Sequence, residues 1–216
     1  MDSVSGVGVL DKAMAVLAAV ERRPASLAEL VARTGLSRAT AHRLAVALEV
    51  HGLVRRDDEG RFCLGLRLIR LGHAATESVP VWAAALPALA WLLAETEESV
   101  QLFVRDGAER VCVESLESDR ELRTIVPVGA RLPLTAGSAA RVLLGEVDPD
   151  GWTASVAERE EGVASVSAPV HGRRGAILAA VSVSGPVNRL GEDPGPRFGP
   201  LVVEAARRIE AATNEA

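Results

Sequence analysis

Two short stretches in the last third of the chain carry serine at every second position. The stretch "ASVSAPV" holds Ser165 and Ser167, and "AVSVSGP" holds Ser182 and Ser184. Because successive side chains of a β-strand point to opposite faces, each serine pair lies on one face and the valines lie on the other. If the two strands form a hairpin, four hydroxyls share a surface that can donate and accept hydrogen bonds. The alternative is that these serines line the solvated face of a sheet.

A predicted helix start adds a positive end to this surface. Segment 135–146, "TAGSAARVLLGE", predicts a helix that begins at Gly137, with Ser138, Ala139 and Ala140 in its first turn. The first N–H groups of a helix have no partner within it and, together with the helix dipole, they favour a carboxylate. The serine strands and this helix start together predict a site for a small organic acid or an amino acid.

A second set of side chains, basic and hydroxyl-bearing, lies near the N-terminus. On a helix over 38–50, the apolar residues share one arc, while Arg38, His42 and Arg43 occupy the other side near the helix start. Ser37 can cap this helix, whose first N–H groups suit a DNA phosphate. The alternative is a solvated helix face that happens to carry arginine.

The elements around this helix predict a winged helix-turn-helix. A first amphipathic helix is expected over 10–22, with Leu10, Ala13, Leu17 and Val20 on its buried face. A short helix then begins with a capping box at "SLAE" and ends near Arg33, and a tight turn at "TGL" leads to helix 38–50. The strands "LVRR" and "RFCL", joined at "DDEG", complete the wing. This order of elements favours DNA binding.

The tip of the predicted wing is acidic. Asp57, Asp58 and Glu59 would repel phosphate, so the arginines on the strands are better DNA contacts than the tip. The residues predicted to contact DNA are therefore Ser37, Arg38, Thr40, His42, Arg43, Arg55, Arg56 and Arg61.

The remainder of the chain predicts a connecting helix and a second domain. Segment 64–78 places leucines on one side of a helix that either pairs with a second copy or packs on its own domain. A helical run follows over 80–97, in which Pro87 is expected to begin a fresh helix. Strands are expected over 99–106, 110–117, 123–128, 162–170 and 175–186, and a final helix over 201–213. This mixed order predicts an α+β chain with an antiparallel sheet.

Composition and motifs narrow the function classes. Residues 1–65 carry nine Lys and Arg against eight Asp and Glu, whereas residues 66–216 carry fifteen against twenty-one. This asymmetry fits a nucleic-acid-binding end joined to an acidic body. Cys63 and Cys112 form no paired motif, and no catalytic or metal-binding motif is present, so neither an enzyme nor a metal or other cofactor is expected. Without a signal-peptide pattern or a long apolar span, a cytoplasmic protein with no membrane partner is expected.

The combined motifs resemble the IclR family of bacterial transcriptional regulators. The segments "VLDKAMAVL", "SLAELVARTGLSRATAHRLAVALEVHGLV" and "GRFCLGLRLIRLG" resemble the DNA-binding half, and "PVGARLPLTAGSAARVLLG" with "GVASVSAPV" resembles the effector-binding half. The resemblance implies a winged helix-turn-helix over 1–64, a linker helix over 65–78 and a GAF-like effector-binding domain over 79–216. It also implies a homodimer or a dimer of dimers. Within the family, the chain is most similar to an actinobacterial subgroup that controls amino-acid biosynthesis.

The resemblance also implies which residues bind the effector, and it shows two departures. Family sites use groups that match Ser138, Ala139, Ala140, Ser155, Ser165, Ser182 and Ser184. The family often has an acid at position 155 and a cysteine at position 165, where this chain has serine. It also carries tens more residues between positions 145 and 151, which implies a more open site or a weakened effector response here.

The resulting hypothesis is a sequence-specific regulator that binds a pseudo-palindromic operator in double-stranded DNA. A small-molecule effector would change its DNA affinity by favouring one dimer geometry. Two rivals remain. One is a ligand-binding or hydrolytic protein whose helical N-terminus serves assembly only, and the other is a regulator switched by thiol oxidation at Cys63 or Cys112.

Overall fold

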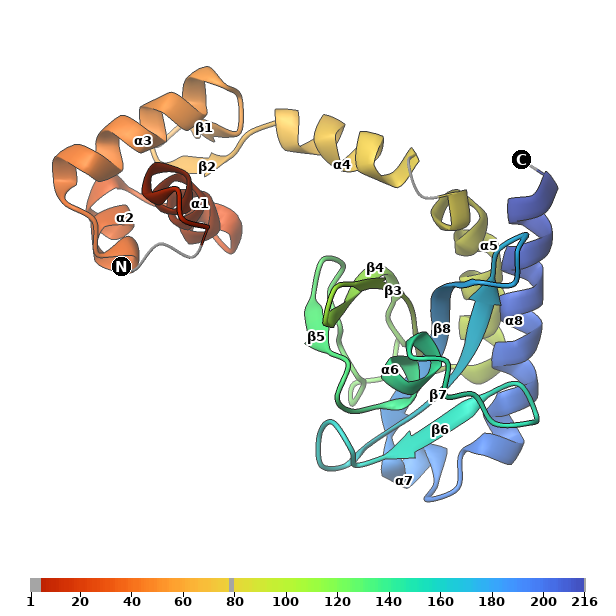
Figure 1. Cartoon of the computed structure of the whole chain (residues 1–216). Helices are drawn as coiled ribbons and strands as arrows, with labels where there is room; N and C mark the ends of the chain where they lie inside the picture. The colour runs from red at the N-terminus through yellow and green to blue at the C-terminus, as the bar shows by residue number, and fades with distance from the viewer. Residues whose placement is uncertain (1–4, 78–79, 216) are drawn as a thin grey trace. The chain divides into compact units, whose positions relative to one another are not determined.

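The computed structural model describes residues 5–77 and 80–215, and the chain divides into two compact units, Met1–Ala75 and Thr76–Ala216. The predicted end of the linker helix, at residue 78, and the predicted start of the effector-binding domain, at residue 79, lie outside the described residues. The first unit contains helices α1 (Gly8–Glu21), α2 (Leu27–Thr34) and α3 (Arg38–Val50), strands β1 (Val54–Arg56) and β2 (Phe62–Leu64), and most of helix α4 (Arg67–Glu77) (Figure 1).

The first unit is a winged helix-turn-helix, as the sequence predicted. Helix α2 begins with the expected capping box, in which Ser26 Oγ accepts from the Glu29 N–H and the Glu29 carboxylate accepts from the Ser26 N–H. It ends at Gly35, whose φ of 69° is the left-handed conformation that glycine adopts without strain. The wing joins the helices because Ala25 and Phe62 exchange two backbone hydrogen bonds of 2.8 Å.

The predicted buried face of α1 is confirmed at three of its four residues. Val20 is buried, and Ala13 and Leu17 pack against the core of the first unit, to which Val16 adds a further buried side chain. Leu10 is 52% exposed, so the prediction was wrong at that residue. The start of α1 therefore exposes apolar side chains: Val7, Val9, Leu10 and Met14.

Helix α4 is attached to its own unit at its first residue. Arg67 Nη1 donates to the His51 carbonyl at 3.0 Å, and its Cβ lies beside Gly52. Leu68 is half-buried, whereas Ile69 and Leu71 are exposed, as is Leu66 just before the helix. Pairing of this helix with a second copy stays a prediction.

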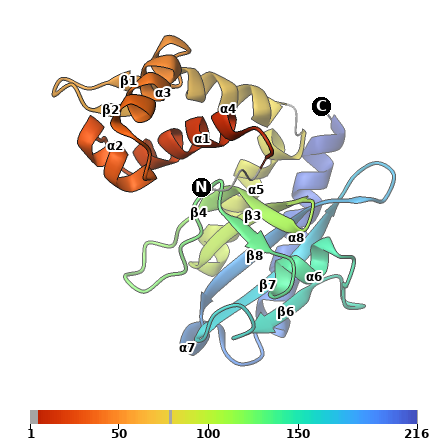
Figure 2. The same cartoon turned by 60° about the vertical axis from the view of Figure 1, so that its left-hand side comes forward.

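The second unit is built on one antiparallel sheet of six strands in the order β5-β4-β3-β8-β7-β6 (Figures 1 and 2). Its strands are β3 (Ser99–Asp106), β4 (Glu109–Leu116), β5 (Arg131–Pro133), β6 (Thr153–Val156), β7 (Val163–His171) and β8 (Ile177–Pro186). Its helices are α5 (Pro80–Thr96), α6 (Ser138–Leu143), α7 (Val187–Leu190) and α8 (Gly195–Glu215). The chain therefore has the predicted α+β class, with a helix-turn-helix domain and an α/β domain built on an antiparallel sheet.

Three local predictions in this unit were wrong. Pro87 lies inside the single helix α5, because the buried stripe of Ala85, Ala88 and Leu92 continues through it against the sheet. Segment 123–128 is not a strand, and the edge strand is β5 instead. Strand β6, which carries Ser155, was not predicted because four residues are too short to show a periodic pattern.

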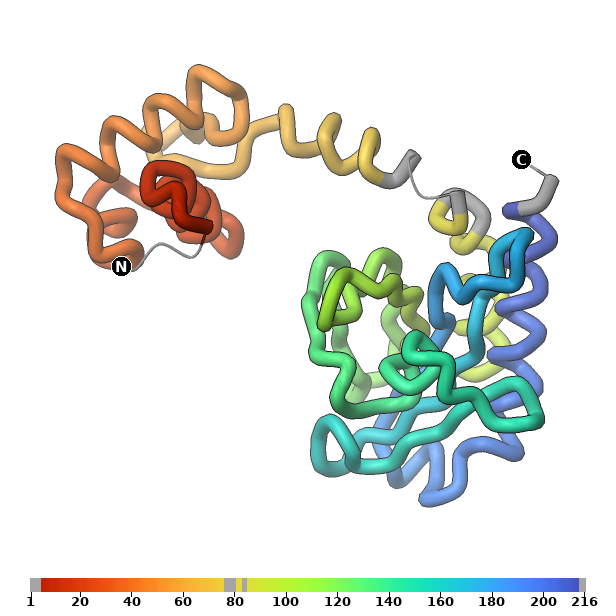
Figure 3. The backbone as a smooth tube through the Cα atoms, viewed as in Figure 1, coloured from red at the N-terminus to blue at the C-terminus, as the bar shows by residue number. Residues whose placement is uncertain are grey.

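Helices cover the two faces of the sheet differently. Helices α5 and α8 pack on the face that carries Val166 and Val183, and α6 packs on the opposite face (Figure 2). The tube view follows β7 and β8 as one hairpin beside α8 (Figure 3). The serines of β7 and β8 therefore lie on the α6 face, as their alternation with valine predicted.

Trp152 fixes the start of β6 to helix α8. Gly195 and Gly199 lie one turn apart on α8, and a Cβ added to either would overlap the Trp152 indole. Only glycine permits this close approach, so the pair holds the strand that carries Ser155 against the helical layer.

We expect Gly199→Ala to lower the free energy of unfolding by about 1–3 kcal/mol, because the new methyl group overpacks the site. Chemical denaturation followed by tryptophan fluorescence measures the change. The matched control is Gly72→Ala in α4, where a Cβ meets nothing within 4 Å and the substitution favours the helix. Equal stability of Gly199→Ala and the wild type would contradict the proposed role of the glycine pair.

Candidate functional site

The start of helix α3 presents polar side chains to solvent. Ser37 caps the helix, since its Oγ accepts from the Thr40 N–H at 3.3 Å and its hydroxyl donates to Thr40 Oγ1 at 2.9 Å. Arg38, His42 and Arg43 are exposed, and their side chains make no hydrogen bond or ion pair with any described residue. These predicted residues share one accessible region, while Ala41, Ala45 and Leu48 on the other arc are buried.

The three arginines of the wing divide into two kinds. Arg55 is exposed, and its side chain has no partner among the residues that the structure describes. Arg56 pairs with Glu49 at 3.3 Å and lies over the Phe62 ring at 4.2 Å from its centroid. Arg61 is held by Asp57 at 2.9 Å and by another acid of the wing tip at 3.0 Å. The positive charge that is free for a phosphate is therefore at Arg55 rather than at Arg61.

The acidic wing tip is explained by its turn. The Asp57 carboxylate accepts from the backbone N–H groups of Glu59 and Arg61, at 3.1 and 2.9 Å. Desolvation alone raises the pKa of this carboxyl, but the hydrogen bonds from Arg61 outweigh it and leave the pKa below its ordinary value. The pKa of Arg61 is raised in return by its hydrogen bond to Asp57. The ion pair therefore stabilises the turn of the wing, and the charge of Arg61 is neutralised by Asp57 in that turn.

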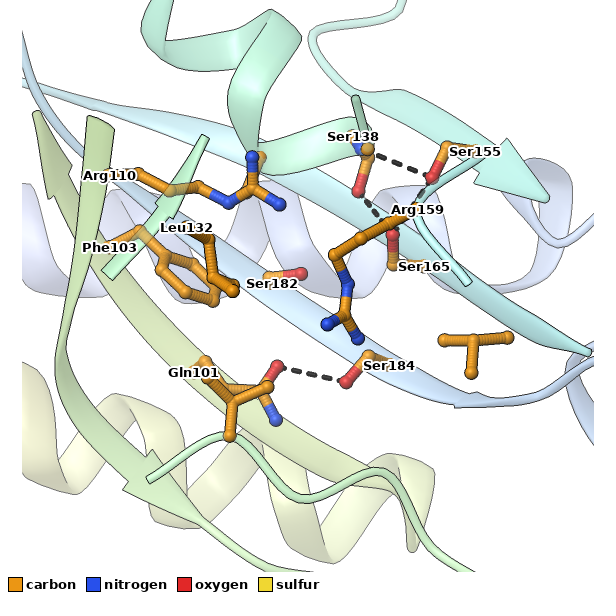
Figure 4. Close-up of a pocket in the computed structure, with 14 residues that line it drawn as sticks. Gln101, Phe103, Arg110, Leu132, Ser138, Ser155, Arg159, Ser165, Ser182 and Ser184 are labelled. Atoms are coloured by element: carbon orange, nitrogen blue, oxygen red, sulfur yellow. Dashed lines mark hydrogen bonds between the residues drawn. The ribbon is translucent and has the colours of Figure 1, made fainter. Parts of the chain in front are cut away.

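On the α6 face of the sheet, five of the predicted serines, 138, 155, 165, 167 and 182, form one hydrogen-bonded chain, of which Figure 4 shows the part at Ser138, Ser155 and Ser165. Ser184 bonds to Gln101 instead. Ser138 Oγ lies 2.7 Å from Ser165 Oγ and 2.8 Å from Ser167 Oγ. Ser155 Oγ lies 3.1 Å from Ser165 Oγ, and Ser167 donates to Ser182 Oγ at 2.9 Å. The hydroxyls of β6, β7, β8 and α6 thus converge, although the hairpin register predicted only those of β7 and β8.

The start of α6 is less open to a ligand than predicted. The Gly137 N–H donates to the Glu158 carboxylate at 3.1 Å, and the Ser138 N–H donates to Ser155 Oγ at 3.1 Å. The N–H of Ala139, which lines the pocket, finds no partner in the described part of the chain. Ala140 is fully buried and lies away from the pocket, because its position on this short helix turns it toward the core beneath α6.

Two buried side chains that the sequence analysis missed complete the inner wall of the pocket. Gln101 is 1% exposed, accepts from Ser184 at 3.0 Å through Oε1, and leaves its Nε2 without a partner. Arg110 is 3% exposed; its Nη1 donates to the carbonyls of Pro133 at 2.5 Å and Ala136 at 2.9 Å, and its Nε has no partner. The alternation of Gln101 with valine and leucine in 99–106 was a usable signal for its place on the serine face.

A third missed residue, Arg159, reaches the pocket from the loop between β6 and β7. Figure 4 shows its guanidinium between Ser165 and Ser184, and the side chain of Arg110 reaching from β4 toward the start of α6. Its loop starts at Ala157, whose φ of 56° is unusual for a residue other than glycine. Neighbouring Glu158 bonds to Gly137, so the loop is attached at the start of α6.

The pocket is small as it stands. It is lined by Phe103, Leu132, the serines, Gln101 and the two arginines, and its volume is about 30 Å³. This volume holds roughly one or two water molecules. The binding sites of organic ligands usually have a volume of about 300 Å³ or more. The expectation of a more open site is therefore wrong, and an organic ligand requires part of the wall to move.

The described residues give little support to the two alternative functions, which were a regulator switched by thiol oxidation and a ligand-binding or hydrolytic protein. Cys63 and Cys112 are both buried, and burial, followed by the charge of Glu114, raises the pKa of the Cys112 thiol to about 12. Such a thiol is almost entirely protonated and therefore a weak nucleophile. Within the described ranges no group of His, Cys, Asp and Glu is arranged to hold a metal ion. No helix of that part of the chain is long and apolar enough to cross a membrane.

The chain belongs to the IclR family of bacterial transcriptional regulators. The model of the IclR helix-turn-helix domain matches residues 9–58, and the model of the IclR C-terminal domain matches residues 73–150 and 145–211. These matches cover both structural units. The chain is therefore a transcriptional regulator, with a DNA-binding and an effector domain, and not an enzyme.

Its relatives agree along nearly the whole chain. It is 30% identical to the HTH-type transcriptional regulator KipR of Bacillus subtilis, over 92% of this chain and 94% of KipR. It is 24% identical to the transcriptional repressor IclR of Escherichia coli, over 87% of this chain and 82% of that one. The crystal structure of Thermotoga maritima IclR has the same fold, with a TM-score of 0.80 at 21% identity over 95% of this chain and 98% of that chain. An IclR homologue of Microbacterium hydrocarbonoxydans, complexed with 4-hydroxybenzoate, also scores 0.80, at 22% identity over 96% of this chain and all of that one.

The comparisons also bear on the short connection between α6 and β6. The alignment with KipR spans 234 positions, more than the 216 residues of this chain, and the C-terminal family match is split at 145–150. The connection leaves the C-terminal end of α6 and closes with a hydrogen bond of 2.9 Å from Thr153 to the Glu146 carbonyl. The pocket lies at the opposite end of α6, so the shortened segment does not open it.

We expect Cys112 to resist alkylation in the folded protein. In a Cys63→Ser variant near pH 8, the raised pKa leaves a thiolate fraction of ~10⁻⁴, against roughly one tenth for a thiol with the ordinary pKa. Iodoacetamide labelling followed by mass spectrometry should therefore be on the order of a thousandfold slower for the native chain than for the urea-unfolded chain. Equal labelling rates for the native and the unfolded chain at that pH would support a regulator that is switched by thiol oxidation.

Proposed function

We propose that this chain is a sequence-specific regulator that binds a pseudo-palindromic operator through helix α3 and the wing and whose DNA affinity is set by a small acid. The observation that carries the DNA-binding part is the set of exposed guanidinium groups on α3 and β1 that have no partner among the described residues. Arg38 and Arg43 lie in the first two turns of α3, where a recognition helix contacts base edges and phosphates. Arg55 adds a free charge on the wing, while Ser37 and Thr40 place hydroxyls between them.

Arg56 and Arg61 are weaker candidates for DNA contacts than Arg38, Arg43 and Arg55. Both guanidiniums already face carboxylates, so a phosphate contact by either would compete with an existing ion pair. His42 is exposed on the same arc as Arg38 and remains a candidate for a base edge. The proposed DNA surface therefore centres on the start of α3 and on β1.

Self-association would supply the second half-site. The first unit exposes two groups of apolar side chains, one at the start of α1 and one along α4, and such groups mark association surfaces in soluble proteins. In a homodimer, or a dimer of dimers, two α3 helices separated by one helical turn of DNA, ~34 Å, would read the two halves of an operator.

The effector part of the proposal rests on the pocket beneath α6. Five serines, 138, 155, 165, 182 and 184, line it together with Gln101, Arg110 and Arg159. These serines hydrogen-bond to one another, to Ser167, to Gln101 or to the start of α6. The Microbacterium homologue that contains 4-hydroxybenzoate supports a small acid as ligand. The proposed membership of a subgroup that controls amino-acid biosynthesis would make the acid an amino acid or a related metabolite.

Because the pocket is small, it would have to change shape when a ligand binds, and this change of shape could transmit the effect of the ligand. The inner wall is formed by residues of paired strands. The loop that carries Arg159 is therefore the part of the wall that can move at the lowest cost in free energy. Displacing this loop would also pull Glu158 from the Gly137 N–H and disturb the start of α6. A ligand that favours the displaced loop would thereby shift the conformation of the effector domain. The direction of control would be repression, as for the relatives named repressors.

We expect the double variant Arg38→Ala, Arg43→Ala to bind duplex DNA more weakly and with less dependence on salt. Each lost phosphate contact lowers the slope of log affinity against log salt concentration by about 0.9, because fewer counterions are released. Titration of a labelled random-sequence duplex at several salt concentrations measures this slope.

The control is Arg174→Ala, which removes an exposed charge between β7 and β8 on the other unit. It should leave the slope unchanged. If the double variant keeps the affinity and the salt slope of the wild type, α3 does not contact DNA and the proposal fails. If the double variant does bind more weakly, footprinting on fragments of its own genome should identify the operator, and the absence of any protected site would count against the proposal.

A further inference from the structure

We propose that helix α3 recognises its operator partly through the methyl groups of thymine, which Ala39 and Val46 contact on either side of a guanine bound by Arg43. The inference rests on the proposed function of α3 in operator binding. It goes further, because it assigns base specificity to two apolar side chains and gives the chemical composition of the operator half-site.

The side of α3 that faces away from the protein core is largely apolar. The buried residues of this helix, which face the core of the first unit, are Ala41, Ala45 and Leu48. At 100° per residue, the opposite side carries Ala39, Arg43, Val46 and Val50, which we call the outer line. Ala39 is exposed, Val46 is half-buried, and Val50 is 79% exposed, more than any other large apolar side chain in the described part of the chain. Packing in the core therefore does not explain why these positions are apolar.

The flank of α3 next to the wing is polar by contrast. Glu49 pairs with Arg56 of β1 at 3.3 Å, so the side of the helix that carries Glu49 is the side next to the wing. Arg38 and His42 lie within about 20° of Glu49 around the helix axis. The polar side chains of the flank therefore lie toward the wing, and Arg43 is the one charged residue of the outer line.

The spacing of the outer line fits neighbouring base pairs. An α-helix rises ~1.5 Å per residue, so Ala39 lies ~6 Å before Arg43 and Val46 lies ~4.5 Å after it. Base pairs are stacked ~3.4 Å apart, so each apolar side chain lies about one or two base pairs from the base that Arg43 contacts. In the major groove, arginine binds O6 and N7 of guanine, and apolar side chains contact the C5-methyl group of thymine. The expected half-site is therefore a guanine with thymine methyl groups on both sides.

A protein partner is the alternative occupant of an exposed apolar surface. The outer line fits a protein less well, because Arg43 lies in its middle, exposed and without a carboxylate partner among the described residues. Burying such a charge in a protein contact is costly, whereas guanine and the DNA phosphates accept hydrogen bonds from it. The arrangement of charge therefore favours DNA.

The test uses DNA duplexes that differ only in methyl groups. The full chain first selects its preferred sequence from a pool of random duplexes, and the thymines of one half-site are then replaced singly by uracil, which pairs identically but lacks the methyl group. Replacement on each side of the guanine should weaken binding about three- to fivefold, as expected for one methyl group returned to water. The slope of log affinity against log salt concentration should not change, because no phosphate contact is lost.

Variants then assign each methyl contact to a side chain. The effect of uracil should fall below about twofold on one side of the guanine in Val46→Ala and on the other side in Ala39→Ser. Replacing the guanine by 7-deazaguanine, which lacks the N7 acceptor, should weaken binding of the wild type but not of Arg43→Ala. The matched control is Val128→Ala, which removes an exposed apolar side chain from the second unit and should behave as the wild type does.

Three outcomes would overturn the inference while leaving operator binding intact. The first is uracil without effect at every thymine of the half-site, and the second is an effect of uracil that is equal in the wild type, Val46→Ala and Ala39→Ser. The third is a lower molecular mass of Val46→Ala in sedimentation, which would place this side chain in a protein contact. If the chain binds random duplexes but selects no preferred sequence, the proposed sequence-specific function fails together with the inference.

Discussion

The pairing of β7 with β8 is the constraint on which the second unit depends. Its register places Ser165 opposite Ser184 and Ser167 opposite Ser182, with Val166 opposite Val183. The valines enter the core beneath α5 and α8, and the serines face α6. A slip by one residue would bury four hydroxyls among valines and expose the valines to the pocket, so the apolar core enforces the polar surface on the other side. The chemistry of the pocket is thus set by packing on the opposite face.

In both units, arginines that pair with a carboxylate stabilise the fold. Arginines that have no carboxylate partner among the described residues are available for a ligand. In the wing, Arg61 and Asp57 neutralise each other while they form the turn, and Arg56 lies between Glu49 and the Phe62 ring. At the start of α3, by contrast, Arg38 is exposed and forms no ion pair with a residue that the structure describes. The same contrast holds in the second unit, where Arg189 pairs with the buried Glu98 at 2.5 Å while Arg110 bonds only to carbonyls. Uncompensated charge therefore marks the two surfaces at which the protein would meet an anion, phosphate in one case and carboxylate in the other.

The effector pocket links a rigid wall to an adjustable one. The serines, Gln101 and Arg110 stand on paired strands or on α6, while Arg159 and Glu158 belong to one loop that begins in an unusual backbone conformation at Ala157. Such a conformation is maintained by surrounding contacts, here the bond from Gly137 to Glu158. If an effector binds here as proposed, its entry and the state of α6 would be coupled through one short segment, whereas the shortened connection before β6 lies at the other end of that helix.

The sequence by itself determined the parts that depend on local physics. The capping box at Ser26, the cap at Ser37, the hairpin turn of the wing and the alternation of serine with valine all follow from neighbours close in the chain, and the structure contains each of them. The order of these elements also sufficed to predict the fold class. Only the tertiary structure decided that Arg56 is paired whereas Arg55 has no partner among the described residues, because Glu49, which pairs with Arg56, lies on α3. Arg61, by contrast, is held by Asp57 and Glu59 of its own turn. The tertiary structure alone brought Arg110 and Arg159, from opposite ends of the sheet, to the serine surface, since strand order and the path of a loop depend on the packing of the whole domain.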